Sequence, residues 1–581
     1  MTASTAQIPL LIGVTGHRDL VADELEQLRQ AVRRFLVALQ ERFPDAPLQV
    51  VSSLSAGADL LVAEEALAAG IECIAVLPLP LELYRSDFAS AAEFERVEAV
   101  LTRCRQRIIC PLPADVTLAD LAEPGPKRDA QYARAGELIA GAAFILLALW
   151  DGRPSVNVAG TASTVEFRLA RRAWLGTAER SAQQDLLPNL PPDFVYHIVV
   201  SRSDSPPLAG LMPLQAGYRC NVRGPLEAPF PATAALIGLR TSELNKTLRR
   251  HSRAIQRHNE KVQLTGELAA PPANVVAVAQ LFGAVDWYAV RMRRSVMRWL
   301  YTTSALMMLM GVFFLLYSDQ PPDCRLCRYS ILAFLAAFLT LLGFNRVAAA
   351  RHWHRRHLES RALAEGLRVE LFWAVAGVAR EGMPAPHRAL LKQADPGLEW
   401  IPNAARVASL MLADVQSTGI AGGVEFAIRR WVGSLNEQNS HSQQLRYYGQ
   451  ASRARGALAT LAERVAGTAV IIGVCLAAFL GREELLGGSR STEVLLFGIG
   501  VFSLLAAVVD ALVHKTAERE LQRQYSYMHD VFLAAHDRLV AARSDDERRS
   551  ILAQLGRSAL AEHAAWLLIH RDRPIDRSRL Q

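Results

Sequence analysis

The chain of 581 residues lacks the features that identify a secreted or a nucleic-acid-binding protein. Residues 1–7 carry no basic start, and the apolar stretch 8–14 is too short for a signal-peptide core. Seven cysteines are scattered along the chain, which suits a reducing compartment. The net charge is +7, yet the arginines form no basic face interleaved with aromatic residues, so no nucleic-acid partner is expected. We therefore expect the N-terminus to lie in the cytoplasm.

Patterns typical of metal and catalytic sites are missing too. Cys324 and Cys327 form a CxxC without the second pair that a zinc site needs, which leaves a disulfide or two free thiols. His352, His354 and His357 are not spaced to share one helix face, so a basic cluster at a membrane edge is expected instead of a metal site. No Ser-His-Asp, Cys-His or paired-carboxylate spacing stands out. We predict neither catalytic residues nor metal ligands.

The first 215 residues alternate short apolar runs with amphipathic stretches such as 22–42 and 58–69. Near-continuous apolar strands separated by helices are typical of a parallel sheet covered on both faces. The sequence therefore predicts a Rossmann-like α/β domain over residues 1–215, followed by a helical linker over 216–284. Its expected strands are residues 9–15, 49–53, 72–77, 107–111, 143–150 and 194–200.

Apolar residues make up 51% of the chain beside 21% charged residues, and four segments concentrate them. The most apolar parts are 299–317, 330–344, 465–480 and 494–509. A helix that crosses a bilayer needs about 20 apolar residues, so three of these segments need flanking residues to complete a crossing. Buried core helices are the alternative. Pairing through loops of about a dozen residues favours two transmembrane hairpins, with spans near 299–317, 328–345, 465–481 and 492–513.

Positive charge gives the expected orientation. Fourteen Lys and Arg residues precede the first segment of each pair or follow the second one. The two loops that connect the paired segments hold only Arg325, Arg328, Arg482 and Arg490. The positive-inside rule places both loops outside and both termini in the cytoplasm. We assign residues 285–464 to the first hairpin with a cytoplasmic helical domain, and 465–581 to the second hairpin with C-terminal helices. The recurrence of a hairpin followed by a long basic helix indicates a degenerate duplication.

Three glycine-bearing segments follow expected strands in the N-terminal domain. Glycine lets the backbone turn tightly beside a ligand, and the following helix presents the positive end of its dipole. Because the carboxyl ends of parallel strands share one edge of a sheet, the three segments predict one phosphate-receiving site. Its expected residues are Gly13, Thr15, Gly16, His17 and Arg18 after the first strand, Ser53, Ser55, Gly57, Ala58 and Asp59 after the second, and Asp151, Gly160, Thr161 and Ala162 after the fifth.

These segments, with the Asp87-Phe88 pair and Trp150-Asp151-Gly152, resemble the SLOG superfamily, which includes LOG enzymes, DprA and the N-terminal region of TRPM channels. The resemblance covers about residues 8–205 and implies a nucleotide ligand, either cyclic or derived from ADP-ribose. Catalytic members carry a glutamate where this chain has Thr164, and Glu166 lies two residues further on. Cleavage of a glycosidic bond needs a carboxylate within reach. Binding without turnover, and no other cofactor, is the expectation.

The membrane portion is similar to SLATT domains, the two-span modules that accompany SLOG sensors in bacterial conflict systems. The likeness covers about residues 285–545 and includes 358–373 and 444–455. It implies a pore-forming effector in a bacterial inner membrane, part of anti-phage defence, released by a nucleotide signal. The spans are almost wholly apolar, so a pore requires a homo-oligomer, for which we guess a tetramer. The alternatives are a membrane-tethered nucleotide or nucleoside hydrolase using Glu166, Asp151 or Asp59, and a scaffold without a pore.

Overall fold

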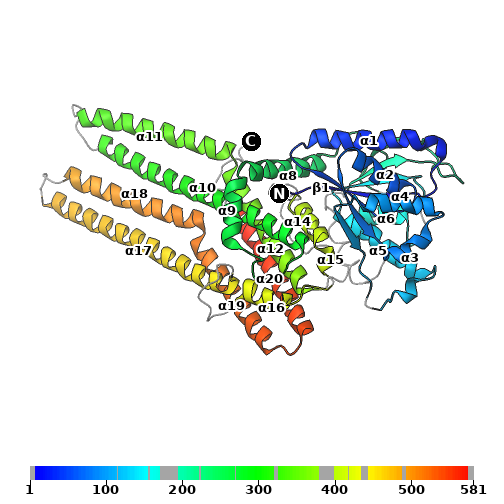
Figure 1. Ribbon diagram of the computed structural model, residues 1–581. Coiled ribbons are helices and arrows are strands. Elements are labelled where there is room, and N and C mark those ends of the chain that lie inside the picture. Colours follow the sequence, from blue (N-terminus) through cyan, green and yellow to red (C-terminus); the bar gives the residue numbers. More distant parts are fainter. Residues whose placement is uncertain are drawn as a thin grey trace. The chain divides into compact units, whose positions relative to one another are not determined.

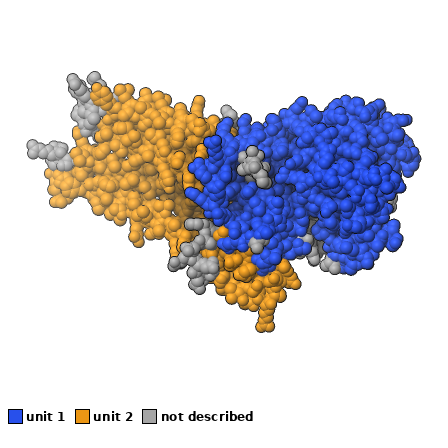
Figure 2. All heavy atoms as spheres, viewed as in Figure 1, with its two compact units in different colours: residues 1–284, 366–424 blue, residues 285–365, 425–581 orange. Residues whose placement is uncertain are grey.

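The structure, a computed structural model, describes residues 7–113, 115–154, 158–170, 194–221, 224–268, 270–318, 325–378, 398, 400–416, 418–433, 443–486 and 492–572 (Figure 1). The chain divides into two compact units (Figure 2). The first comprises residues 1–284 and 366–424, and the second comprises residues 285–365 and 425–581. The first unit holds the sheet and the second is all-helical among its described residues.

A seven-stranded sheet forms the centre of the first unit, with the strand order β4-β3-β2-β1-β5-β6-β7. The first six strands are parallel and β7 is antiparallel to β6. The order therefore reverses direction between β1 and β5. The strands are β1 (Leu10–Gly16), β2 (Leu48–Ser52), β3 (Glu72–Leu77), β4 (Gln106–Ile109), β5 (Ile145–Trp150), β6 (Phe194–Val199) and β7 (Ala216–Arg219).

Helices join the parallel strands, as the alternating pattern predicts. Right-handed crossovers place α1 (Leu25–Arg42), α2 (Ala58–Ala68) and α4 (Ala91–Leu101) on one face of the sheet, and α5 (Pro126–Ala142) and α6 (Thr161–Ala170) on the other. The contacts agree, since α2 packs against both α1 and α4, and α5 packs against α6. The short connections contain the 3-10 turn Ala22–Glu24, helix α3 (Leu81–Tyr84) and the 3-10 turns Arg85–Asp87 and Ala119–Leu121. Both α/β character and the parallel sheet are confirmed.

The sheet extends beyond the expected end of the domain at residue 215. Strand β7 lies in the stretch expected to form a linker, and Tyr218 pairs with Tyr196 of β6. Helix α8 (Ala232–Arg250) is joined to β1 because Asn245 exchanges two hydrogen bonds of 2.9 Å with the backbone of Ile8. It is followed by α9 (Ser252–Val262). The region 216–284 therefore packs with the α/β unit instead of forming a separate linker.

A later segment also belongs to the first unit, although the sequence assigns it to the first hairpin. Helix α14 (Trp400–Met411) packs against α5 and α8, and Arg406 donates to the carbonyl of Ala143 at 3.4 Å. The short α15 (Ala413–Gln416) packs against β4, where Gln106 donates to Asp414 at 2.7 Å. These contacts join residues separated by about 300 positions, which local sequence patterns do not encode.

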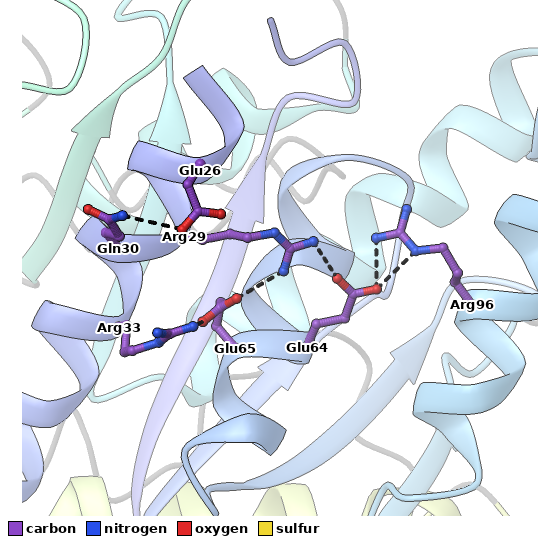
Figure 3. A network of polar contacts seen from close by, with 7 residues as sticks. All are labelled: Glu26, Arg29, Gln30, Arg33, Glu64, Glu65 and Arg96. Atoms are coloured by element: carbon purple, nitrogen blue, oxygen red, sulfur yellow. Dashed lines mark hydrogen bonds and ion pairs between the residues drawn. The ribbon is translucent and has the colours of Figure 1, made fainter. Parts of the chain in front are cut away.

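An arginine–glutamate network covers the helical face formed by α1, α2 and α4 (Figure 3). Glu65 accepts from Arg29 at 2.9 Å and from Arg33 at 2.8 Å, and its side chain is 5% exposed. Glu64 links Arg29 to Arg96 of α4 at 2.8 and 2.7 Å. Burial alone would raise the pKa of Glu65, but the hydrogen bonds from Arg29 and Arg33 outweigh it and lower that pKa. The network therefore ties three helices together.

We expect Glu65→Gln to destabilise the chain by about 2 kcal/mol, because a buried carboxylate with two arginine partners is lost and the partners are only partly replaced. Glu64→Gln is the matched control, with an expected cost below about 1 kcal/mol, since Glu64 is more exposed. Urea unfolding of the purified full chain measures both. The lowered pKa adds a second test: the stabilisation by Glu65 is present above its unfolded pKa and is lost as the pH falls. Equal effects of the two substitutions would contradict this assignment.

The second unit is built mainly from long helices. They are α10 (Ala273–Ser318), α11 (Arg325–Ala350), α12 (Trp353–Ala376), α16 (Gly423–Ala427), the π-helical turn Ile428–Val432, α17 (Gln444–Leu485), α18 (Thr492–Thr516), α19 (Glu518–Ala541) and α20 (Asp545–Asp572). The boundary between the units falls within α10, within α12 and within α16. Helix α17 packs against α18 and α19, and α19 against α20. Met528 and Phe532 of α19 are fully buried.

Four helical stretches among the described residues are long and apolar enough to cross a membrane. In the most apolar 18-residue window of each, between 0 and 17% is buried. Leu339, Ile471 and Val474 expose 57, 65 and 62% of their surface. Core helices bury such side chains, and soluble monomers rarely expose so large an apolar surface. The alternative of four buried core helices is therefore wrong, and the chain has the character of a membrane protein.

The two halves of the helical region repeat one geometric pattern. Helix α11 has 26 residues and α12 has 24, while α18 has 25 and α19 has 24. In each half the break between the two helices contains a residue in the left-handed region, His352 with φ 49° and Ala517 with φ 52°. A non-glycine residue rarely adopts this conformation. Its recurrence at matching places supports the internal duplication indicated by the sequence.

Candidate functional site

The predicted site residues gather at the carboxyl ends of β1, β2 and β5. Strand order reverses between β1 and β5, which is where open parallel sheets commonly hold ligands. The loop after β1 remains attached to β5, because the His17 N–H donates to the Leu149 carbonyl at 3.1 Å. It is also attached to α2, because the His17 carbonyl accepts from the Ala58 N–H at 3.0 Å. Three segments far apart in sequence therefore meet around His17.

Close backbone packing explains the glycines of this region. A Cβ on Gly16 would lie 2.3 Å from the Cβ of Ala58. Gly57 has φ +78°, and a Cβ there would lie 2.4 Å from the Arg18 carbonyl oxygen. Gly13 lies further back in β1, where a Cβ would meet Ala143 of the other layer at 2.9 Å. These three glycines let the β1 loop, α2 and α5 approach one another, so their presence alone does not require a ligand.

The turn after β2 is held by its own hydroxyl groups. Ser52 accepts from the Leu54 N–H at 3.0 Å, and Leu54 adopts a positive φ of 56°. Ser53 donates to Asp59 Oδ2 at 2.5 Å and lies 2.9 Å from the Ser55 hydroxyl. The Tyr84 hydroxyl donates to the Ser53 carbonyl at 3.1 Å. Tyr84 is fully buried, and its participation was not predicted because it lies on α3, beyond the next strand.

Asp59 is the least satisfied group of the site. It is 5% exposed, and its Oδ1 atom has no hydrogen-bond partner among the described residues. Burial raises the pKa of Asp59 to about 6, although hydrogen bonds from Ser53 and Ser55 and the charge of Arg18 act in the opposite direction. A buried polar atom without a partner costs about 1–3 kcal/mol, and perturbed carboxyls are enriched at functional sites. Asp59 is therefore the strongest functional candidate.

A second buried carboxylate lies on the other side of the β1 loop. Asp151 is 2% exposed, and its Oδ1 lies 3.1 Å from His17 Nε2. The same oxygen accepts from the Arg153 N–H at 3.0 Å, which fixes the turn after β5. His17 Nε2 has no hydrogen-bond partner among the described residues, so its contact with Asp151 is an electrostatic one.

The exposed Arg18 and the ion pair between Asp87 and Arg128 complete the surroundings of the site. The Arg18 guanidinium lies 5.7 Å from the ring centre of Tyr132. Tyr132 in turn donates to Asp87, which also pairs with the buried Arg128 at 2.8 Å. Asp87 was noted only through family resemblance, and Arg128 and Tyr132 were missed because they lie on α5, whose sequence shows only ordinary helical polarity. Asp87 pairs with Arg128 and Asp19 pairs with Arg202, whereas Asp59 has no ion pair with a Lys or Arg side chain among the described residues.

The third predicted segment, Gly160 to Ala162, lies at the N-terminus of α6, which follows β5. Gly160 has φ +133°, with open space where a Cβ would stand. Thr161 and Ala162 begin α6 and are 8% and 4% exposed. Thr164, at the position of the expected catalytic glutamate, donates to the Gly160 carbonyl at 3.0 Å and packs over Gly136 of α5. Glu166 is half-buried on the next turn. Thr15, on β1, is 8% exposed and paired with β5.

A buried histidine supports the end of β5 from behind. His197 Nδ1 accepts from Arg219 Nε at 2.9 Å, so its Nε2–H donates to the Trp150 carbonyl at 2.7 Å. Burial lowers the pKa of His197 to about 4. The ring is therefore neutral near pH 7 and joins β5, β6 and β7 just before Asp151. Sequence reasoning did not find it, because His197 stands alone in an apolar strand.

We expect His197 to make the chain sensitive to acid. Its folded pKa lies below its unfolded value of about 6.5, so its stabilisation is present above pH 6.5 and is lost as the pH falls toward 4. The expected loss is about 3 kcal/mol. The measurement is the difference between the native chain and His197→Gln in urea unfolding from pH 7 to pH 4. Taking the difference cancels Asp59, whose raised pKa acts in the opposite direction. A difference that does not change with pH would contradict the assignment.

Among the described residues, no group of three or more His, Cys, Asp or Glu side chains could hold a metal ion. His357 lies edge-on to Trp566, 5.9 Å between ring centres, in a helical packing role. Cys324 lies outside the described residues. Comparison of the chain with family models, with curated proteins and with solved structures gave no match. The function is therefore argued from the geometry of this chain.

Proposed function

We propose that this protein is a membrane effector that senses a nucleotide second messenger and responds by opening a pore. The observation that carries the proposal is Asp59, a buried carboxyl with a free oxygen at the carboxyl edge of a parallel sheet. A chain without a ligand to bind gains nothing from this arrangement, which lowers its stability. The same chain provides four helices of membrane-spanning length. A small-molecule site and a membrane region in one chain fit a ligand-gated device.

The charges of the site favour a nucleotide with exposed ribose hydroxyls and few phosphates. Asp59 and Asp151 are buried carboxylates, which accept hydrogen bonds from hydroxyl groups and repel phosphate. Arg18 is exposed and can pair with one phosphate group at the rim. The Ala58 N–H at the start of α2 is already bound to the His17 carbonyl. Cyclic or ADP-ribose-derived nucleotides meet these requirements better than a nucleoside triphosphate. The first unit would then have a Rossmann-like fold and would bind a nucleotide as SLOG domains do.

The membrane region supports a pore only through association of several chains. Helix α17 packs on α18, where Leu476 contacts Gly498. Leu315 of α10 contacts Gly500 of α18, and Trp299 of α10 donates to Asn345 of α11 at 2.9 Å. Two SLATT-like hairpins with outer loops and cytoplasmic termini are consistent with these contacts. The spans are mostly apolar, so a homo-oligomer, with a tetramer as our guess, would surround a pore kept closed by dewetting.

Transmission of the signal would use the two helix breaks beside the spans. His352 and Ala517 each interrupt a helix that leaves the membrane region. Such positions absorb a change in backbone angles at low cost to the helices on either side. The nucleotide can shift the equilibrium only by its difference in affinity for the closed and open states. In a bacterial inner membrane, an effector of this kind would permeabilise the cell in anti-phage defence.

The test measures nucleotide binding and ion flux with the full chain in lipid nanodiscs and liposomes. Calorimetry against cyclic and ADP-ribose-derived nucleotides is expected to find one ligand that binds, and Asp59→Asn is expected to weaken it about tenfold or more. The variant should at the same time be more stable at pH 7 by about 1–2 kcal/mol, because folding no longer charges a buried carboxyl. Glu95→Gln, an exposed charge on α4, is the matched control.

These outcomes separate a binding residue from a structural one. A structural Asp59 would lose stability and binding together, whereas a binding residue loses binding and gains stability. Ion flux from liposomes should appear only with the bound nucleotide and should be lost in Asp59→Asn. If no nucleotide binds, or if binding occurs without flux, the proposed effector function fails, and a scaffold without a pore remains.

A membrane-tethered nucleotide or nucleoside hydrolase is the second candidate, and the pKa of Asp59 favours it. A carboxyl with a pKa of about 6 can donate and accept protons near neutral pH. Thr164, at the position of the expected catalytic glutamate, has no carboxyl group and is turned toward α5. Incubation with each binding nucleotide decides the matter. Product formed by the native chain and by Glu166→Gln, but not by Asp59→Asn, would replace the sensor with an enzyme.

A further inference from the structure

A second candidate binding site lies on the first unit, apart from the residues predicted to bind the nucleotide. A groove of about 510 Å³ runs between α1 and the last two strands, β6 and β7. Its origin is topological: α1 is the last helix on its face of the sheet, and β6 and β7 continue beyond it. Ala31 and Ala38 present small side chains along the helical wall. The groove has the size of a small-molecule site.

Aromatic rings line the groove on its strand side. Tyr196 of β6 stacks on Phe35 of α1 with ring centres 4.1 Å apart and planes inclined by 13°. Tyr218 of β7 lies 4.9 Å from Tyr196, and Phe230 lies 5.4 Å from Tyr218. All four rings line the groove. Burial raises the pKa of both tyrosines, so their hydroxyls stay protonated at neutral pH and can donate hydrogen bonds. Such a surface favours a flat aromatic ring.

Two arginines give the groove its charge. Arg34 and Arg42 both line it, and the guanidinium of Arg42 lies 4.2 Å from the ring centre of Phe230. Neither arginine has a carboxylate partner among the described residues. The contrast lies on the same helix, where Arg29 and Arg33 are both paired with glutamates (Figure 3). The groove side of α1 therefore carries positive charge that the chain does not neutralise.

From these observations we propose that the groove binds a small planar aromatic anion, such as an aromatic carboxylate, sulfonate or phosphate ester. The ring would stack against the aromatic side chains of β6 and β7, and the anionic group would pair with Arg34 or Arg42. A long acyl chain would leave the flat rings unstacked, and a cation would meet the two arginines. The proposal is independent of the nucleotide site, because none of the groove's lining residues is among those predicted to bind the nucleotide.

The probe is naphthalene-2-sulfonate, titrated against the full chain in nanodiscs by equilibrium dialysis, with empty nanodiscs as background. Saturable binding of one molecule per chain is expected, about tenfold weaker for the neutral analogue 2-naphthalenemethanol. The double variant Arg34→Gln/Arg42→Gln should weaken the sulfonate about tenfold or more, and Ala31→Phe should abolish its binding by filling the groove. Arg107→Gln is the control for loss of a positive charge elsewhere, since Arg107 is exposed on β4 at the opposite edge of the sheet.

Each result has one meaning. Binding that is lost in the double variant, kept in Arg107→Gln and kept in Asp59→Asn establishes the groove as a separate site. Binding that falls in Asp59→Asn would place the probe at the nucleotide site and overturn the proposal. Absence of saturable binding, or equal binding of the neutral analogue, would also overturn it. The double variant changes only exposed side chains, so it keeps the test valid if Ala31→Phe does not fold.

Discussion

Replacing Gly57 by alanine is expected to cost roughly 3 kcal/mol or more of folding stability and to abolish nucleotide binding. Two effects add. The residue has φ +78° and ψ −120°, a backbone conformation that an alanine adopts only with strain. Its new Cβ would also lie 2.4 Å from the Arg18 carbonyl oxygen and 2.6 Å from that of His17. Both obstacles are backbone atoms, so relief requires the β1 loop to separate from α2.

Gly70 offers a matched control for this substitution. It has φ +72°, close to that of Gly57, but nothing lies within 4 Å of the position of its Cβ. Gly70→Ala is therefore expected to cost only about 1 kcal/mol and to leave binding unchanged. Urea unfolding and calorimetry of the two variants measure the difference, which reports the close approach of the loops together with the ψ angle of −120° at Gly57. Equal costs would show that Gly57 serves backbone conformation alone.

The second large effect concerns the membrane. Ile471 lies in α17 and is 65% exposed, in a stretch expected to face lipid. An arginine in the middle of a membrane helix costs about 2.5–3.5 kcal/mol of insertion free energy. Ile471→Arg is therefore expected to lower the equilibrium constant for insertion of this span by about a hundredfold. Tyr527→Arg is the control, because Tyr527 is 64% exposed on α19, outside the predicted spans.

Cys475 reports the outcome directly. It is an exposed free cysteine one turn along α17 from Ile471. In intact liposomes, lipid should protect it from a water-soluble maleimide in the native chain and in Tyr527→Arg. Ile471→Arg should expose it to labelling, as located by peptide mapping. Labelling of Cys475 in the native chain would mean that this face of α17 is in contact with water.

Much of the site could be anticipated because its residues follow strands whose pattern is plain. The run Leu10–Gly16 is apolar and ends in glycine, and parallel strands bring such ends to one edge. The special character of Asp59 could not be anticipated. Its pKa depends on burial beneath the β2 turn and on the distance to Arg18, and neither is encoded in the neighbouring letters. Tyr84, Arg128 and Tyr132 come from helices whose sequences show nothing unusual.

The sequence by itself determined the features that depend on local composition: the apolar strands of the sheet, the four long apolar helices and the amphipathic stripes of the helices that follow them. Hydrophobic periodicity is a short-range property, so these features can be recognised from about twenty residues at a time. Only the tertiary structure decided that β7 joins the sheet, that residues 366–424 pack with the N-terminal unit, and that Arg34 and Arg42 stay unneutralised beside a groove. Each of these features depends on which distant segments pack together. The free energy of that packing comes from contacts between segments, so the sequence of one segment does not reveal it.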